Sequence, residues 1–181
     1  MTWRPLRIDV YDFDGTLFRS PERPGDWSGS WWSHPASLNP PVVPALPGND
    51  WWNMDVVDRA RQSIANPDVV TVLITGREAD KFTLRVKELL LSVGLEFDHI
   101  ELSNGDDTQK FKLGVIDAMM KRYLSARGVN LWEDREVHLR AYADHVEASG
   151  RAAFPHLVTV PAHEPATTPS SVSVADRYLR K

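Results

Sequence analysis

Five short apolar runs rich in β-branched residues recur along the chain and are predicted to be β-strands. They are residues 7–13, 69–75, 97–102, 129–133 and 156–160. The second run, VVTVLIT, has almost no polar break, a pattern typical of strands that are covered on both faces of a parallel sheet. The hydrophobic pattern therefore predicts a buried parallel sheet of about five strands.

The segments between these runs have the periodicity of helices. Residues 77–94 carry an apolar stripe at helical spacing, and Gly94 is a suitable stop. The stripe consists of Phe82, Val86, Leu89, Leu90 and Val93. A second helix is expected within residues 111–128, ending near Gly128, and a third over about 135–149. Alternating strands and helices predict right-handed crossovers and a three-layer, Rossmann-like α/β domain with helices on both faces of the sheet.

Residues 19–52 interrupt this alternation with a stretch rich in Pro, Gly, Ser and Trp. A loop of this length is normally either functional or disordered. Five of the seven tryptophans lie between Trp27 and Trp52, and their rings can bury a large area, which argues for order. We expect a small ordered flap or cap after the first strand. Its tryptophans are expected to form the core of the insert; base contacts by Trp31, Trp32, Trp51 or Trp52 are the alternative.

Composition narrows the class of protein. At 181 residues, one domain is expected over residues 1–163, followed by a Pro/Ser/Thr-rich linker and C-terminal segment over 164–181. The net charge of −4 argues against a broadly basic nucleic-acid surface, and the absence of cysteine excludes disulfides and thiolate metal sites. No apolar run approaches the roughly 20 residues that span a bilayer, and the N-terminus lacks the apolar core of a signal peptide. A cytoplasmic protein without a membrane partner is expected.

Carboxylates stand at the ends of two predicted strands. Asp12 and Asp14 end the first strand, Thr75 ends the second, and Glu133 and Asp134 end the fourth. Buried acids are costly unless they are paired, hydrogen-bonded or bound to a metal. Because ligands of open α/β sheets bind beyond the carboxyl ends of the strands, these side chains are expected to converge.

A lysine is expected to join them from the next helix. This helix starts near Thr108 at the same edge of the sheet, because it follows the third strand. Its apolar stripe, extended backward from Ile116 by one turn, reaches Lys112 on the core-facing side, whereas Lys110 falls on the polar side with Asp117. Periodicity favours Lys112, with Lys110 as the alternative.

Such a set of groups has a direct chemical interpretation. Several hard oxygen ligands with room for water are typical of a Mg²⁺ site that protein and phosphate share. A threonine hydroxyl and a lysine ammonium supply donors for the oxygens of a phosphoryl group. A carboxylate beside a metal ion and a lysine stays ionised and can act as a nucleophile.

Each of these residues also has an ordinary structural explanation. The DG of a strand end can form a turn in which Asp12 or Asp14 caps the next helix. Thr75 can serve as a helix N-cap, and Glu133 and Asp134 suit the positive end of a helix dipole. The presence of all these groups in order along one chain favours chemistry over structure.

The motifs DFDGTLF and LITGR, a lysine opening the third helix, and EDR together resemble the four motifs of the haloacid dehalogenase-like (HAD) phosphohydrolase superfamily. VYDFDGTLFRSP, the Trp-rich insert, TQKFK and LWEDREVH resemble more closely the HAD domain family of Swiss-army-knife RNA-repair proteins, over about residues 6–160. In one respect the chain departs from the wider superfamily: His138 stands where a second acid commonly follows the fourth strand.

The resemblance implies roles for individual residues. Asp12 would attack phosphorus and form an aspartyl-phosphate, and Asp14 would protonate the leaving oxygen and then activate water. Mg²⁺ would be held by the Asp12 carboxylate, the Asp14 main-chain carbonyl and Asp134, with Glu133 helping directly or through water. Thr75 and Lys112 would complete the catalytic set.

Further residues receive weaker assignments from the same resemblance. Gly76 and Arg77 are expected to contact the substrate. Arg135 and His138, like Arg77, could contact phosphate or orient an acid, and each could equally be a surface or ion-pairing residue.

The leading hypothesis is a Mg²⁺-dependent phosphomonoesterase acting on RNA or DNA ends or on a nucleotide. Phosphorylated small metabolites are the alternative substrates, and a non-catalytic binding module on the same fold is the alternative class. Dehalogenation is disfavoured, because its aspartate needs neither the second acid Asp14 nor a metal ligand such as Asp134. The oligomeric state is left open.

Overall fold

The computed structural model describes residues 4–163, whose strands and helices alternate along the chain. The strands are β1 (Arg7–Asp12), β2 (Val69–Glu78), β3 (His99–Ser103), β4 (Gly128–Glu133) and β5 (Ala152–Leu157). The helices are α1 (Met54–Ile64), α2 (Ala79–Ser92), α3 (Thr108–Arg122) and α4 (Glu136–Ala148). Residues 164–181, the predicted linker and C-terminal segment, lie outside the described residues.

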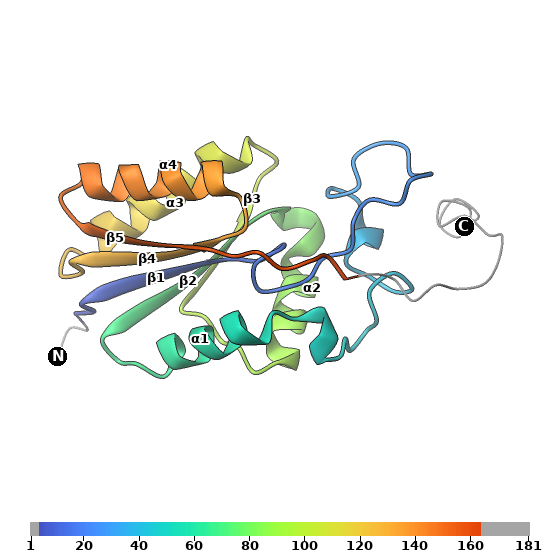
Figure 1. Cartoon of the computed structure of the whole chain (residues 1–181), viewed down its shortest axis with the longest axis horizontal. Coiled ribbons are helices and arrows are strands. Elements are labelled where there is room, and N and C mark those ends of the chain that lie inside the picture. The colour runs from blue at the N-terminus through green and yellow to red at the C-terminus, as the bar shows by residue number, and fades with distance from the viewer. Residues whose placement is uncertain (1–3, 164–181) are drawn as a thin grey trace.

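The five strands form one parallel sheet in the order β3-β2-β1-β4-β5. Helices α1 and α2 cover one face, and α3 and α4 cover the other (Figure 1). The predicted three-layer, Rossmann-like parallel sheet is confirmed. Strand order reverses between β1 and β4, and the carboxyl ends of strands at such a reversal are where α/β sheets bind ligands.

Alternation along β1 divides the core into two parts. Ile8 and Val10 pack with the buried residues of α3 and α4, whereas Tyr11 and Phe13 pack with those of α1 and α2. Successive side chains of a strand point to opposite faces, so Asp12 continues the series of Ile8 and Val10. This alternation directs the last side chain of β1 toward α3.

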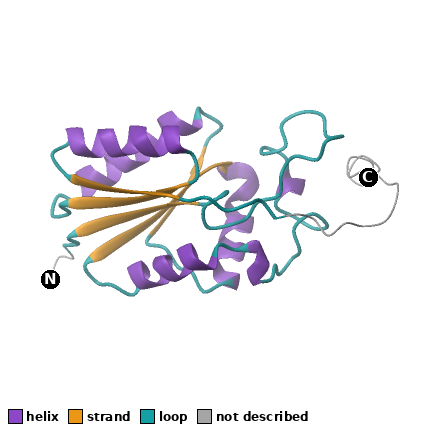
Figure 2. Ribbon diagram, in the orientation of Figure 1, coloured by secondary structure: helices purple, strands orange, loops and turns teal. Residues whose placement is uncertain are grey.

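The insert between β1 and α1 is ordered and packed. It contains two short 3₁₀ turns, Pro35–Ser37 and Asn49–Trp51. Trp31, Leu38 and Val43 are each at most 1% exposed, which agrees with the expected core of a small flap. Figure 2 shows its loops beyond the carboxyl ends of the strands. The insert therefore lies over the edge where the acids were expected to meet.

One helix and two element boundaries differ from the sequence-based predictions. Helix α1 was not predicted, because its sequence MDVVDRARQSI is mostly polar and carries only a narrow apolar stripe. The fifth strand starts at Ala152, not at residue 156; Pro155 lies inside it, which is tolerated because β5 is an edge strand. Helix α3 ends at Arg122 and not near Gly128, because the chain turns there and the Arg127 amide donates to the Leu6 carbonyl.

A fourth difference concerns the end of the second strand. Strand β2 continues past Thr75 to Glu78, with a register shift against β3 at this point. Glu78, not Thr75, is the N-cap residue of α2. The Thr75 hydroxyl is therefore not used in capping that helix.

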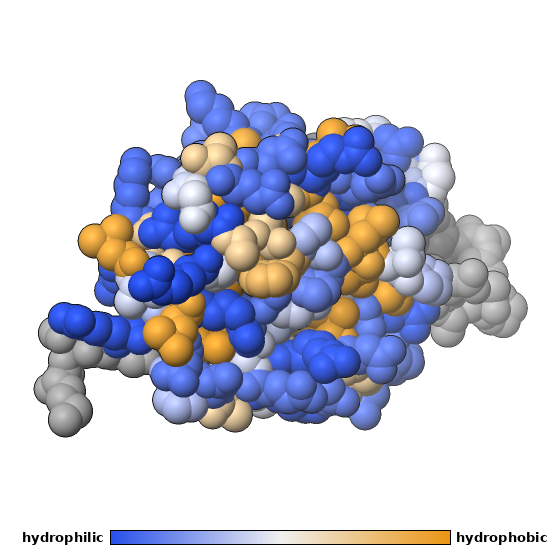
Figure 3. Space-filling model, turned by 60° about the vertical axis from the view of Figure 1, so that its left-hand side comes forward, coloured by the Kyte–Doolittle hydropathy of each residue, from blue (hydrophilic) through white to orange (hydrophobic). Residues whose placement is uncertain are grey.

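The surface is mixed in character. Figure 3 shows a largely hydrophilic face on which hydrophobic residues form separate patches.

Within residues 4–163, no helix combines the length and the apolar character needed to cross a membrane.

Candidate active site

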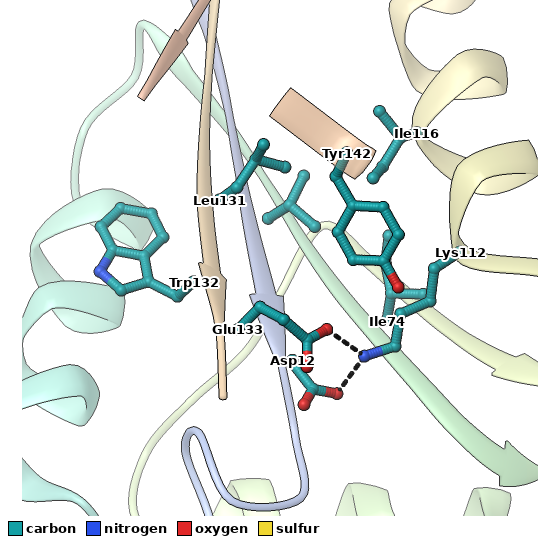
Figure 4. Close-up of a pocket in the computed structure, with 9 residues that line it drawn as sticks. Asp12, Ile74, Lys112, Ile116, Leu131, Trp132, Glu133 and Tyr142 are labelled. Atoms are coloured by element: carbon teal, nitrogen blue, oxygen red, sulfur yellow. Dashed lines mark hydrogen bonds and ion pairs between the residues drawn. The ribbon is translucent and has the colours of Figure 1, made fainter. Parts of the chain in front are cut away.

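The carboxyl end of β1 holds a buried ion-paired cluster. The Lys112 ammonium donates to Asp12 Oδ1 at 2.6 Å and to Glu133 Oε2 at 2.8 Å, as Figure 4 shows. All three side chains are at most 6% exposed. Three elements thus meet here, because Asp12 ends β1, Glu133 ends β4 and Lys112 lies in the first turns of α3.

Burial and charge oppose each other at these groups. Burial raises the pKa of Asp12, Lys112 opposes this shift, and the neighbouring Glu133 carboxylate adds to it. Burial works to lower the pKa of Lys112, but Asp12 and Glu133 outweigh it, so the pKa is raised. The lysine therefore stays protonated and holds two carboxylates that would otherwise repel each other in a site of low polarity.

Asp134 adds a third carboxylate beside this pair. Asp12, Glu133 and Asp134 each offer an oxygen atom, and these atoms lie within 4.8 Å of one another. Oδ1 of Asp134 is buried and has no hydrogen-bond partner within residues 4–163, and burial raises the pKa of this group. A buried oxygen that accepts no hydrogen bond, among three hard ligands, fits a divalent cation such as Mg²⁺.

Gly15 makes the close approach of Asp134 feasible. Its backbone has φ +75°, and a Cβ at this position would overlap the Asp134 carboxylate. A residue with a side chain would be both strained and in collision with a candidate metal ligand. The glycine of DFDGTLF thus has two physical reasons to be there.

Asp14 lies on the other side of the cleft in a separate network. Arg77 donates to its carboxylate from Nη2 at 2.7 Å and from Nε at 3.1 Å. Ser20 Oγ donates at 2.6 Å and Thr75 Oγ1 at 3.2 Å. Burial works to raise the pKa of Asp14, but the charge and hydrogen bonds of Arg77 outweigh it and the pKa is lowered. Asp14 is therefore held as a carboxylate.

Arg77 also joins the acid to the insert. Its Nη1 donates to the main-chain carbonyl of Trp32 at 2.9 Å and to the hydroxyl of Ser37, and its guanidinium lies 5.0 Å from the centre of the Trp32 ring. The side chain is almost wholly buried. In this structure Arg77 orients Asp14 and anchors the flap.

A cleft of about 580 Å³ opens between these groups, a size suited to a small ligand. Asp12, Asp14, Asp134, Gly76 and Arg77 all line it. Gly76 packs directly against Thr108, so a side chain there would collide with the start of α3. The cleft therefore brings together groups from β1, β2 and β4.

The remaining predicted residues occupy different places. Lys110 is exposed, whereas Lys112 reaches Asp12. Arg135 lines the cleft and lies 4.0 Å from Asp134. His138 lies within 3.4 Å of the Tyr142 hydroxyl, and burial lowers its pKa. The position that commonly holds an acid thus holds a half-buried imidazole.

Sequence reasoning missed two groups that touch this site. Ser20 donates to Asp14, and Tyr142 lines the small buried pocket beside Asp12 and Lys112 in Figure 4. Ser20 lies only six residues after Asp14, yet nothing in the sequence shows that the turn folds back on the acid. Tyr142 lies on the core-facing side of α4, and nothing in the sequence distinguishes it from an ordinary core residue.

Comparison with known proteins gives a family match. Residues 22–171 match the family described as HAD domain family 1 in Swiss Army Knife RNA repair proteins. The matched range begins after Asp12 and Asp14. The assignment of these two residues to the site therefore rests on the sequence motif and on the geometry. The matched range covers most of the chain.

Individual relatives are distant. The chain is 24% identical over 165 residues to the uncharacterized protein YMR265C of Saccharomyces cerevisiae, and the alignment covers 75% of this chain and 36% of that protein. The chain thus spans about a third of the length of this relative. The HAD domain of effector protein Lem4 from Legionella pneumophila matches with a TM-score of 0.47 and 15% identity, over 93% of this chain and 91% of that domain. An inactive mutant of the same domain matches with the same score.

The chain belongs to HAD domain family 1 of the Swiss Army Knife RNA repair proteins, within the HAD-like superfamily.

Proposed function

We propose that this protein is a Mg²⁺-dependent phosphatase that hydrolyses a phosphomonoester through an aspartyl-phosphate on Asp12. One observation carries the proposal: oxygen atoms of Asp12, Glu133 and Asp134 lie within 4.8 Å of one another beside the Lys112 ammonium. An arrangement of this kind gives one carboxylate a cationic environment in which it can act as a nucleophile.

Asp12, the main-chain carbonyl of Asp14, and Asp134 would hold Mg²⁺, with Glu133 helping directly or through water. When bound, the ion would orient the phosphate and neutralise its charge. Oδ1 of Asp134 is buried and accepts no hydrogen bond within residues 4–163, which such an ion would explain. Glu133 Oε2 already accepts a hydrogen bond from Lys112. The other oxygen, Oε1, which accepts from the Arg135 amide, is left for the ion or its water.

In the first step an Asp12 oxygen attacks phosphorus, the bond to the ester oxygen breaks, and the leaving oxygen takes a proton from Asp14. Lys112 supplies positive charge beside the attacking oxygen. The Thr75 hydroxyl, which donates to Asp14 in this structure, would turn to donate to a phosphoryl oxygen. In the second step the Asp14 carboxylate takes a proton from water, the water oxygen attacks phosphorus, and phosphate leaves Asp12.

The two steps make opposite demands on Asp14. The first needs a protonated acid, and the second needs the carboxylate that Arg77 stabilises. The structure as it stands therefore favours the second role. A substrate whose leaving group needs no proton avoids the conflict, which makes p-nitrophenyl phosphate the appropriate first probe.

The physiological substrate is proposed to be a nucleic-acid end or a nucleotide, because the matched family is described by its RNA repair proteins. Phosphorylated small metabolites would use the same chemistry and are the second candidate. The cleft at the mouth of the site is open enough for either. A non-catalytic module would keep the fold without turnover.

The test is hydrolysis of p-nitrophenyl phosphate with Mg²⁺ and with EDTA, for wild type, Asp12→Asn and the surface control Asp58→Asn. We expect a Mg²⁺-dependent rate that falls by at least about a thousandfold in Asp12→Asn, because the amide is not a nucleophile, and that is retained in Asp58→Asn. Full activity in EDTA, or in Asp12→Asn, would contradict the mechanism.

A poor generic substrate would not end the test, because the intermediate can be mimicked directly. Beryllofluoride with Mg²⁺ should attach to Asp12 in a crystal of the wild-type protein. Absence of both turnover and this adduct would favour the non-catalytic module.

A further inference from the structure

We propose that Trp32 is a stacking platform for the base of a nucleoside monophosphate whose phosphate lies at Asp12. The proposal rests on the proposed phosphatase function and adds to it a residue that selects the substrate. The tryptophans of the insert differ in how far they are exposed.

Three of the four tryptophans considered for base contact are unavailable to a ligand. Trp31 is 1% exposed, Trp51 6% and Trp52 3%, so these rings form the core of the insert and its junction with α1. Trp32 is 48% exposed and lines the cleft that contains Asp12 and Asp14. Trp32 therefore offers a large apolar ring to a ligand at the wall of a polar cleft.

The position of Trp32 is fixed by the site itself. One guanidinium, that of Arg77, donates to the Trp32 carbonyl at 2.9 Å and to Asp14 at 2.7 Å. The same group lies 5.0 Å from the centre of the Trp32 ring. The ring is therefore held in place before a ligand arrives, which reduces the entropy that binding must overcome.

The spacing favours a nucleotide over a simple aryl phosphate. The Arg77 guanidinium lies between them: it bonds to the Asp14 carboxylate on one side, and its carbon is 5.0 Å from the centre of the Trp32 ring. A ring bonded directly to the phosphate oxygen would remain close to Asp14. A base is separated from its phosphate by a sugar, and this spacer allows it to reach Trp32.

The charge of the cleft favours a mononucleotide. Beyond the candidate metal ligands, Glu22, Glu78 and Asp106 line its walls. Of its two cations, Arg77 is paired with Asp14 and Arg135 lies 4.0 Å from Asp134. Such a surface repels the many phosphates of a nucleic-acid strand. A nucleoside monophosphate carries a single phosphate, which would bind at Asp12. Its neutral base would stack on Trp32 without being repelled by the acidic walls.

The test compares kcat/KM for adenosine 5′-monophosphate and for ribose 5-phosphate, which share phosphate and sugar and differ in the base. In the wild type we expect the nucleotide to be preferred by about tenfold or more, as aromatic stacking on a base supports. Trp32→Ala should reduce this ratio to near one, and Trp32→Phe should retain most of it. Leu46→Ala, an exposed apolar residue of the same insert, should keep the wild-type ratio.

Trp32→Leu guards against a variant that fails to fold, because it keeps apolar bulk but cannot stack. It too should lose the preference for the nucleotide. A wild-type ratio near one, or an unchanged ratio in Trp32→Ala and Trp32→Leu, would overturn the platform while leaving the phosphatase intact. If the wild type hydrolyses neither compound nor p-nitrophenyl phosphate, the proposed function and the platform fall together.

Discussion

The charge balance of the site depends on Lys112. Its ammonium contacts Asp12 at 2.6 Å and Glu133 at 2.8 Å, and no other cation within residues 4–163 bonds to Asp12. Lys110, two residues earlier, is exposed on the same helix. The two lysines therefore offer a matched pair for testing which one the site uses.

Lys112→Met should leave two buried carboxylates without their cation. Removing one partner of a buried ion pair costs about 3–5 kcal/mol, so we expect a loss of this size in the free energy of unfolding measured in urea with EDTA. Phosphatase activity should also disappear. Lys110→Met should change stability by less than about 0.5 kcal/mol and keep the activity. Equal effects from the two substitutions would show that the lysine has been assigned wrongly.

At the scale of elements, α2 holds the insert in place. Arg85 of α2 donates to the main-chain carbonyls of Leu38 at 2.9 Å, Pro44 at 2.7 Å and Ala45 at 3.0 Å. The side chain is only 8% exposed. One guanidinium thus satisfies three carbonyl groups of a segment that has little regular structure of its own.

Arg85→Met should loosen the insert without touching the acids. The Leu38 carbonyl is buried, and losing its partner costs about 1–3 kcal/mol, so the insert should open more often. We expect protease cleavage within residues 19–52 to be at least about tenfold faster, with the cut sites located by mass spectrometry. Lys87→Met, which removes an exposed cation from the same helix, is the control. Equal cleavage of both variants would mean that Arg85 does not anchor the insert.

At the scale of the whole molecule, the candidate metal site joins β1 to β4 at the point where the strand order reverses. A cation there would bridge two segments that lie more than a hundred residues apart in sequence. Because it would bind only the folded chain, it should stabilise the fold as a whole. Of the three acids, Asp134 has the buried oxygen that accepts no hydrogen bond within residues 4–163.

Saturating Mg²⁺ should therefore raise the melting temperature of the wild type. A ligand at about a hundred times its Kd adds about 2.7 kcal/mol, which corresponds to roughly 5–10 °C for a domain of this size. Asp134→Asn should lose most of this rise, and the surface control Asp144→Asn should keep it. In EDTA, Asp134→Asn should be at least as stable as the wild type, since burial raises the pKa of Asp134 and its charged form is therefore disfavoured. The same Mg²⁺-induced rise in Asp134→Asn and wild type would argue against this ligand.

Much of the fold follows from the short-range pattern of apolar and polar residues along the chain. The apolar runs and helical stripes predicted the parallel sheet and three of the four helices in the described part of the chain. Helix α1 and the start of β5 were missed, because α1 is largely polar and β5 opens with two alanines. In both, packing against the sheet supplies stability that the local sequence does not display.

The sequence by itself determined which acids stand at strand ends, and helical periodicity alone favoured Lys112 over Lys110. Such patterns are local, and the regular geometry of a strand or helix determines from them the direction in which each side chain points. Only the tertiary structure decided that Arg77 joins Asp14 to the insert, that Ser20 folds back on the acid, and that Trp32 alone of four tryptophans lines the cleft. These outcomes depend on contacts between segments distant in sequence, and local periodicity carries no information about which distant side chains will meet.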